Sequence, residues 1–135
     1  MNDQTPMRDG FGRRIEYLRI SVTDKCNLRC VYCMPEAGLP WLKQDEILSF
    51  EEIESIVRVM AQMGLRRVRL TGGEPLVRPN LVDLVQRLAA IPGIEDIALS
   101  TNGVLLAPLA GELLAAGVRR VNISLDSLEP DRIDA

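Results

Sequence analysis

The feature that most constrains the fold of this chain is a fourfold alternation of short strand-like and longer helix-like segments. Short runs rich in β-branched residues are typical of strands, and they occur at 17–23, 67–71, 96–100 and 120–125. Between these runs, apolar residues recur with the spacing of an amphipathic helix. Strand, loop and helix repeated in this order indicate parallel strands joined by right-handed crossovers. We therefore expect an α/β fold.

The expected helices carry start and stop signals. Ser49 and Glu52 form a capping box at the start of the first helix, and Gly64 is a natural end. The apolar face of this helix is expected to contain Ile53, Ile56, Val57 and Met60. The second helix, which ends at 91–93, is expected to bury Leu81, Leu84, Val85 and Leu88. The third is expected at 105–116, with Gly117 closing it.

Four such units are about half of a closed (β/α)8 barrel. A barrel of this kind typically has about 250 residues, whereas this chain has 135. A parallel sheet that stopped at its fourth strand would leave one edge unpaired, which is unusual. We therefore expect a partial, TIM-like (β/α) barrel of about four units, truncated after its fourth strand. Residues 1–14 are expected to form a flexible N-terminal arm, and residues 15–135 the N-terminal part of the barrel domain. The alternative is a small, complete doubly wound sheet of four strands.

Three cysteines, Cys26, Cys30 and Cys33, lie within eight residues, and the chain has no histidine. Three thiolates on one loop can hold three irons of a cubane iron–sulfur cluster. The fourth iron is then open to a small molecule, whereas most ferredoxin clusters use four thiolates. A structural zinc site usually has four Cys or His ligands, and disulfides would leave one cysteine unpaired. A zinc site completed by a carboxylate and a set of incidental cysteines remain the alternatives.

Polar residues follow each expected strand, where the active sites of α/β barrels lie. They are Asp24 and the cysteines after the first strand, Gly72-Gly73-Glu74-Pro75 after the second, 100–103 after the third, and Ser124 and Asp126 at the fourth. Two glycines allow a backbone to approach a ligand closely. We expect the negative charge of Glu74 to lie beside such a ligand, where it would suit the ammonium group of an amino acid.

Two arginines, Arg19 and Arg69, lie inside expected strands among apolar neighbours. A lone buried charge is very costly, so each arginine needs a partner. The partner is either an acidic residue in a structural ion pair or a ligand, because a guanidinium group can bind a phosphate or a purine through paired hydrogen bonds.

Composition narrows the classes of partner. The chain has 16 basic and 19 acidic residues and a net charge of −3, so no basic field indicates binding to nucleic acid. No apolar run approaches the ~20 residues needed to span a membrane. The polar segment 1–12 lacks the apolar core of a signal peptide, so we expect a cytoplasmic protein, in a compartment where thiols stay reduced.

The cysteine loop, with the aromatic Tyr32 inside it, resembles the signature of radical S-adenosylmethionine (SAM) enzymes, and Gly72-Gly73-Glu74-Pro75 resembles the second motif of that family. A narrower match through 18–35, 67–78, 101–103 and 122–127 resembles the GTP 3′,8-cyclases, which begin molybdenum cofactor biosynthesis. The resemblance implies a radical SAM barrel, a 4Fe–4S cluster whose open iron is chelated by SAM, and reductive cleavage of SAM to a 5′-deoxyadenosyl radical. The radical would then drive cyclisation of GTP.

The resemblance also implies roles for individual residues. Cys26, Cys30 and Cys33 would bind the cluster; Tyr32, Gly73 and Ser124 would contact SAM; and Arg19, Arg69 and Ser100 would contact GTP. At Ser100 the family often carries threonine, so the hydroxyl group is kept.

Other features of the cyclase family are not found in this sequence. The family has a second 4Fe–4S cluster, bound by three cysteines of its C-terminal half, and a C-terminal double glycine. We therefore expect the chain alone to be inactive and its full-length parent to be the enzyme. The resemblance further implies an electron donor such as flavodoxin or ferredoxin and allows a homodimeric parent. Another radical SAM enzyme with a different substrate, or a non-catalytic iron–sulfur module, is the alternative.

Overall fold

The computed structural model describes residues 5–28 and 40–133, and these form a parallel sheet in the order β1-β2-β3-β4. The strands are β1 (Tyr17–Ser21), β2 (Arg67–Thr71), β3 (Asp96–Thr101) and β4 (Val118–Ile123). The connecting helices are α1 (Phe50–Gln62), α2 (Leu81–Ala89) and α3 (Leu106–Ala116). Shorter helices are η1 (Gln44–Glu46), η2 (Pro75–Val77) and α4 (Pro130–Ile133).

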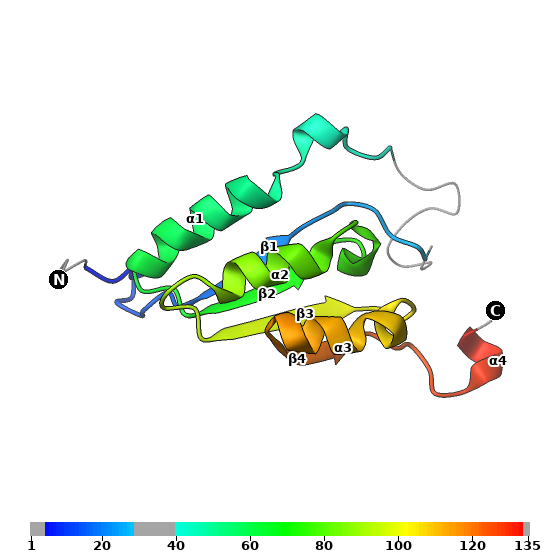
Figure 1. Cartoon of the computed structure of the whole chain (residues 1–135). Coiled ribbons are helices and arrows are strands. Elements are labelled where there is room, and N and C mark those ends of the chain that lie inside the picture. The colour runs from blue at the N-terminus through cyan, green and yellow to red at the C-terminus, as the bar shows by residue number, and fades with distance from the viewer. Residues whose placement is uncertain (1–4, 29–39, 134–135) are drawn as a thin grey trace.

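Each strand of the sheet lies next to the strand that follows it in the chain. The spatial order of the strands is thus their order in the chain, and all three strand pairs are parallel. Right-handed crossovers between successive neighbours place α1, α2 and α3 on the same face, and α1 packs beside α2, which packs beside α3 (Figure 1). A doubly wound sheet would instead reverse its strand order and put helices on both faces. The described residues therefore have the arrangement of a barrel wall, as expected.

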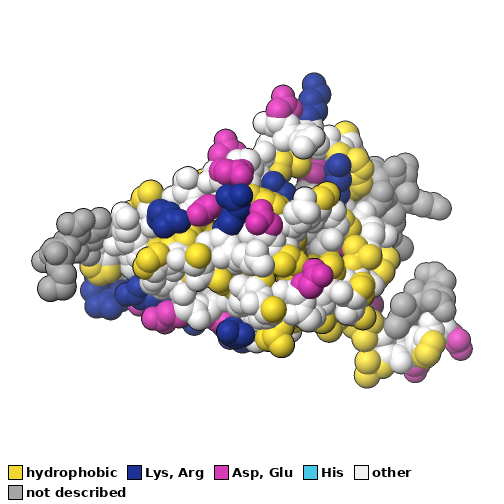
Figure 2. Space-filling view, in the orientation of Figure 1, with side chains coloured by type: hydrophobic (Ala, Val, Ile, Leu, Met, Phe, Trp, Pro, Cys, Tyr) yellow, Lys and Arg dark blue, Asp and Glu magenta, His cyan; other side chains and the backbone are white. Residues whose placement is uncertain are grey.

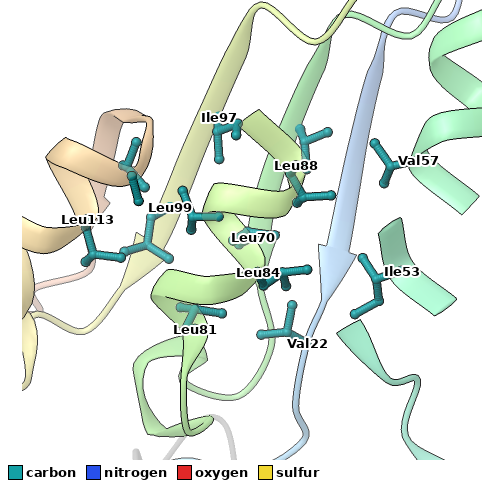
Figure 3. Packing of buried hydrophobic residues seen from close by; sticks show 14 of the residues in the cluster. Val22, Ile53, Val57, Leu70, Leu81, Leu84, Leu88, Ile97, Leu99 and Leu113 are labelled. Carbon is teal, nitrogen blue, oxygen red and sulfur yellow. The ribbon is translucent and has the colours of Figure 1, made fainter. Parts of the chain in front are cut away.

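The core lies between the sheet and the helices (Figure 3). Alternate strand residues such as Leu70 and Leu99 point toward the helices and are fully buried. They meet Leu84 and Leu88 of α2, and Val57 of α1 and Leu113 of α3 extend the cluster to either side. All four apolar positions expected on the second helix, Leu81, Leu84, Val85 and Leu88, are buried.

The opposite face of the sheet is polar. Register places Arg19 beside Arg69, Ala98 and Arg120 in one row across the four strands. The next row toward the carboxyl ends contains Ser21, Thr71, Ser100 and Asn122. Since residues directly paired in a parallel sheet share a face, the side chains of both rows lie on the side away from the helices.

The start of α1 is the expected one. The Ser49 hydroxyl accepts a hydrogen bond from the Glu52 backbone at 3.1 Å, and the Glu52 carboxylate accepts one from the Ser49 backbone at 2.7 Å. Ile53 and Val57 are buried and Met60 is partly buried, but Ile56 is 45% exposed. The expectation for Ile56 was wrong because this residue lies at the free edge of the sheet, in a shallow groove with Leu48, where the described residues do not cover it.

Four strand boundaries differ by one or two residues from the expected ones, and two of these are that β3 ends at Thr101 rather than 100 and β4 ends at Ile123 rather than 125. β1 ends at Ser21 rather than 23, because the chain then turns toward the end of β2. The Val22 backbone still donates to the Thr71 carbonyl at 3.0 Å. β4 begins at Val118 rather than 120, since Val118 pairs with Ile97 before an irregularity in the ladder shifts the register.

Surface contacts join the helices and the start of the chain. Arg87 of α2 forms ion pairs with Glu51 and Glu54 of α1 and with Asp83, and Figure 2 shows charged side chains gathered over this part of the surface. At the other end of α1, the Met7 backbone donates to the Met63 carbonyl at 3.0 Å.

No helix in the described part of the chain is long and apolar enough to cross a membrane.

We predict that Leu84→Ala lowers the free energy of unfolding by about 2–5 kcal/mol, because it removes a fully buried side chain at the centre of the core. Leu114→Ala on α3 is the matched control, since that leucine is 60% exposed, and its effect should stay within about 0.5 kcal/mol. Urea unfolding of both variants measures the difference. Equal losses for the two substitutions would contradict the assignment of the core.

Candidate active site at the carboxyl edge of the sheet

The segment that leads to the cysteines crosses directly over the end of β2. The Gly73 backbone donates to the Thr23 carbonyl at 2.9 Å, and the Glu74 backbone donates to the Lys25 carbonyl at 2.8 Å. The Lys25 backbone in turn donates to the Thr23 hydroxyl at 3.1 Å. These bonds fix the segment that leads into Cys26 against the Gly-Gly-Glu-Pro loop, so the start of the cysteine motif and this loop form one structural unit.

Both glycines of this loop are required by that crossing. A Cβ atom on Gly72 would lie 2.5 Å from the Thr23 carbonyl oxygen, and one on Gly73 would lie 2.3 Å from the Lys25 carbonyl oxygen. Both distances are far below van der Waals contact, and Gly72 also has a φ of +149°. We expected the glycines to allow the approach of a ligand. The structure shows that they allow the approach of the cysteine segment's own backbone.

Glu74 has a different role from the expected one. Its side chain is 1% exposed. One carboxylate oxygen accepts hydrogen bonds from the Thr101 hydroxyl at 2.6 Å and the Leu76 backbone at 3.2 Å, and the other accepts one from the Asn102 backbone at 2.7 Å. The expectation that its charge lies beside a ligand is wrong, because the carboxylate is buried and bonded within the protein. It joins the loop after β2 to the loop after β3.

Asn102 extends this connection to the first cysteine. Its side-chain nitrogen donates to the Asn27 side-chain oxygen at 2.7 Å and lies 4.0 Å from the Cys26 sulfur. The Leu28 backbone also donates to this sulfur, at 3.4 Å. Sulfur atoms that bind iron–sulfur clusters commonly accept such N–H hydrogen bonds. The surroundings of Cys26 therefore fit those of a cluster ligand.

The other residues expected around the cluster fall outside the described part of the chain. They are Cys30, Cys33 and Tyr32. Among the described residues, no three Cys, Asp or Glu side chains gather into a metal-binding group. Of the expected cysteine ligands, Cys26 lies in the part of the chain that the structure describes.

Two side chains join the flanks of the cysteine-bearing segment. The Asp24 carboxylate accepts a hydrogen bond from the Leu42 backbone at 2.6 Å. Arg78 donates to the Val22 carbonyl and to the Leu48 carbonyl, both at 2.8 Å, and its guanidinium lies 4.3 Å from the ring centroid of Phe50. Burial lowers the pKa of Arg78 below its ordinary value. Both contacts hold the two ends of the segment together.

Sequence reasoning did not single out Arg78. The available signal was an arginine placed immediately after an apolar pair in the loop that follows β2. An arginine in a segment that is otherwise buried needs acceptors, but the sequence does not reveal that these acceptors are backbone carbonyls far away in the chain.

The two arginines predicted inside strands lie on the polar face of the sheet. Arg69 donates to the Tyr17 hydroxyl at 2.9 Å and to the Ser100 hydroxyl at 3.2 Å. Arg19 pairs with Arg69 in register. Within the described residues neither arginine forms an ion pair, so the alternative of a structural partner with opposite charge is not observed there. The structure thus brings Arg19, Arg69 and Ser100 together.

Ser124 lies one step beyond β4, where its backbone donates to the Thr101 carbonyl at 2.9 Å. Gly73 follows β2 and Ser100 lies near the end of β3. Of the residues expected to contact SAM, Gly73 and Ser124 therefore lie at the carboxyl edge of the sheet, while Arg19, Arg69 and Ser100 lie on its polar face.

We predict that Gly73→Ala destabilises the protein by more than about 1 kcal/mol and reduces the iron bound after anaerobic reconstitution, because the new methyl group collides with the Lys25 carbonyl. Gly111→Ala is the matched control, since no atom lies within 4 Å of its added methyl group. It should stabilise α3 by about 0.5–1 kcal/mol and leave the iron content unchanged. Iron analysis and urea unfolding test both statements, and normal iron content in Gly73→Ala would contradict this view of the loop.

Relatives with high sequence identity carry one name. The chain is 60% identical over 129 residues to the GTP 3′,8-cyclase of Heliobacterium modesticaldum, which covers 96% of this chain and 39% of that protein. It is 61% identical over 126 residues to the GTP 3′,8-cyclase of Pelotomaculum thermopropionicum, with 93% and 39% covered. The chain thus spans about two fifths of the length of these curated relatives.

Solved structures and a family profile agree on the fold. The chain superposes on BtrN in an open conformation with a TM-score of 0.64 at 19% identity, covering 89% of this chain and 54% of BtrN. BtrN in complex with AdoMet and 2-DOIA gives a TM-score of 0.63 at 17% identity, with 89% and 50% covered. The profile of the Radical SAM superfamily matches residues 20–135. This chain therefore belongs to the radical SAM superfamily.

Proposed function

We propose that this chain supplies the N-terminal part of the barrel of a GTP 3′,8-cyclase, which converts GTP to (8S)-3′,8-cyclo-7,8-dihydroguanosine 5′-triphosphate in the first step of molybdopterin biosynthesis. Identities of about 60% to proteins of that name support the proposal. The structural observation that carries it is the convergence of Arg19, Arg69 and Ser100 on the polar face, beside the edge that holds Cys26.

In this proposal, Cys26, Cys30 and Cys33 bind the 4Fe–4S cluster that membership of the radical SAM superfamily implies. When bound, the cluster supplies the electron that cleaves SAM to a 5′-deoxyadenosyl radical. The N–H groups of Leu28 and Asn102 face the Cys26 sulfur, an arrangement common around sulfur ligands of iron–sulfur clusters. Tyr32, Gly73 and Ser124 contact SAM. The placement of Gly73 and Ser124 along the carboxyl edge of the sheet, where Cys26 also lies, supports that assignment.

The arginines would hold the substrate. Arg69 already has its guanidinium oriented by the Tyr17 and Ser100 hydroxyls, and pre-oriented donors lose little entropy when a ligand binds. A guanidinium group without an acidic partner suits a triphosphate or the acceptor edge of guanine. Ser100 adds a hydroxyl group on the same polar face of the sheet, and Arg19 adds a second positive charge in register with the first.

The same proposal includes the electron donor, a second cluster, the oligomeric state and the cellular compartment of the full-length protein. The full-length protein takes electrons from a donor such as flavodoxin or ferredoxin, carries a second 4Fe–4S cluster in its C-terminal half, and forms a homodimer. It works in the cytoplasm, where its thiols stay reduced. Residues 15–135 belong to the barrel, and residues 1–14 form an N-terminal arm.

We predict that the full-length protein, reconstituted anaerobically and reduced, gives a cubane electron paramagnetic resonance signal that shifts when SAM is added. Cys26→Ala should abolish the SAM-dependent shift, because the sulfur ligand is lost. A SAM-responsive cluster that survives in Cys26→Ala would contradict the assignment of this ligand. A colourless protein containing zinc would contradict the cluster itself.

We predict that Arg69→Ala and Arg19→Ala each weaken GTP binding by about tenfold or more, because a hydrogen bond to a charged group is worth about 1.5–3 kcal/mol. Calorimetric titration of GTP into the full-length protein measures the effect. Arg58→Ala is the control, since Arg58 pairs with Glu54 on the outer surface of α1. Unchanged GTP affinity in both variants, with the SAM-responsive cluster intact, would indicate a radical SAM enzyme with a different substrate.

A further inference from the structure

We infer that Asn102 is a positioning residue for the iron–sulfur cluster: its side-chain N–H group donates to the Cys26 sulfur and sets the electron affinity of the cluster. The inference rests on the proposed role of Cys26 as a cluster ligand and is independent of the identity of the substrate. Asn102 comes from the loop after β3, so it reaches the cysteine segment from a different part of the chain.

The orientation of the Asn102 side chain is fixed from both sides. Its backbone N–H donates to the buried Glu74 carboxylate at 2.7 Å. Its side-chain oxygen accepts a hydrogen bond from the Val104 backbone at 3.1 Å. An amide oxygen accepts and an amide nitrogen donates, so the bond from Val104 leaves the nitrogen to face the cysteine segment. The direction of the donor therefore follows from the fold and not from a free side-chain rotation.

The donor has two acceptors in the cysteine segment. The Asn102 nitrogen lies 2.7 Å from the Asn27 side-chain oxygen and 4.0 Å from the Cys26 sulfur. An NH₂ group has two hydrogens, so it can serve both. The Leu28 backbone donates to the same sulfur from the other side, at 3.4 Å. The Cys26 sulfur thus receives one N–H group from its own loop and one from the end of β3.

Such a donor has a defined effect on a cluster. Hydrogen bonds to the sulfurs help to set the reduction potential of iron–sulfur clusters. A positive N–H dipole aimed at the sulfur stabilises the reduced cluster, which carries one more negative charge, more than the oxidised one. Removing this donor should therefore lower the reduction potential of the cluster. Substitution of residues that orient metal ligands also typically weakens metal binding, by about 10–100-fold.

The substitutions Asn102→Asp and Asn102→Ala together test this effect. Aspartate keeps an oxygen that accepts the hydrogen bond from Val104, but it replaces the donor by a negatively charged oxygen. Asn27→Ala is the matched control, because it removes the second acceptor and leaves the donor to Cys26 in place. Asn102→Ala removes the donor without adding charge. All three are made in the full-length protein, and the potential is measured by redox titration of the resonance signal that shifts with SAM.

We expect Asn102→Asp to lower the electron affinity of this cluster about tenfold, which is about 59 mV for a one-electron couple. Asn102→Ala should shift it in the same direction by a smaller amount, and the rate of iron loss to a chelator should rise about tenfold in both. Asn27→Ala should match the unsubstituted protein. Iron loss in both Asn102 variants, with unfolding midpoints of the metal-free proteins unchanged, would also support the inference.

An unchanged potential in Asn102→Asp, with the cluster present, would overturn the inference while the proposed function stands. So would equal shifts in Asn102→Asp and Asn27→Ala, which would indicate packing of the loop and not the donor. Lower unfolding midpoints of the metal-free Asn102 variants, in parallel with their iron loss, would overturn it as well. A SAM-responsive cluster in Cys26→Ala would remove the proposed ligand and the inference together.

Discussion

The buried carboxylate of Glu74 is the interaction on which the site depends. It accepts hydrogen bonds from the Thr101 hydroxyl and the Asn102 backbone, while its own backbone donates to the carbonyl of Lys25. A buried charge is tolerated only where hydrogen bonds replace its hydration. One residue therefore holds together the loops that follow β1, β2 and β3. The position of Cys26 relative to Asn102 depends on this junction together with the hydrogen bond from Asn102 to Asn27.

The two faces of the sheet have different roles, since one packs against the helices and the other carries the candidate site. Apolar residues at alternate positions join the helices into a core, and the positions between them carry arginine and hydroxyl side chains on the opposite face. Because side chains alternate along a strand, a single residue shift would exchange core and site. The packing of Leu70 against α2 thus also determines that Arg69 points toward Ser100.

Much of the fold could be predicted from the sequence. The four strands, the capping box at Ser49 and the buried face of α2 follow from local patterns, because their signals lie within a few residues. The role of Glu74 could not be predicted, since its acceptor function depends on Thr101 and Asn102, which only the folded sheet brings near. Arg78 was missed for the same reason. Ile56 has the spacing of a core residue, but its burial depends on what covers the edge of the sheet.

The close crossing at Gly72 and Gly73 has a consequence for the order of events in the cell. The backbone bonds that hold Thr23 and Lys25 come from residues that are synthesised well after Cys26. Glu74, which anchors that crossing, is itself held by Thr101 and Asn102, which are synthesised later still. The cysteine segment therefore gains its final support only after β3 has left the ribosome and paired. If Cys26 binds the proposed cluster, delivery of iron and sulfide to a well-positioned Cys26 would accordingly follow the assembly of the sheet.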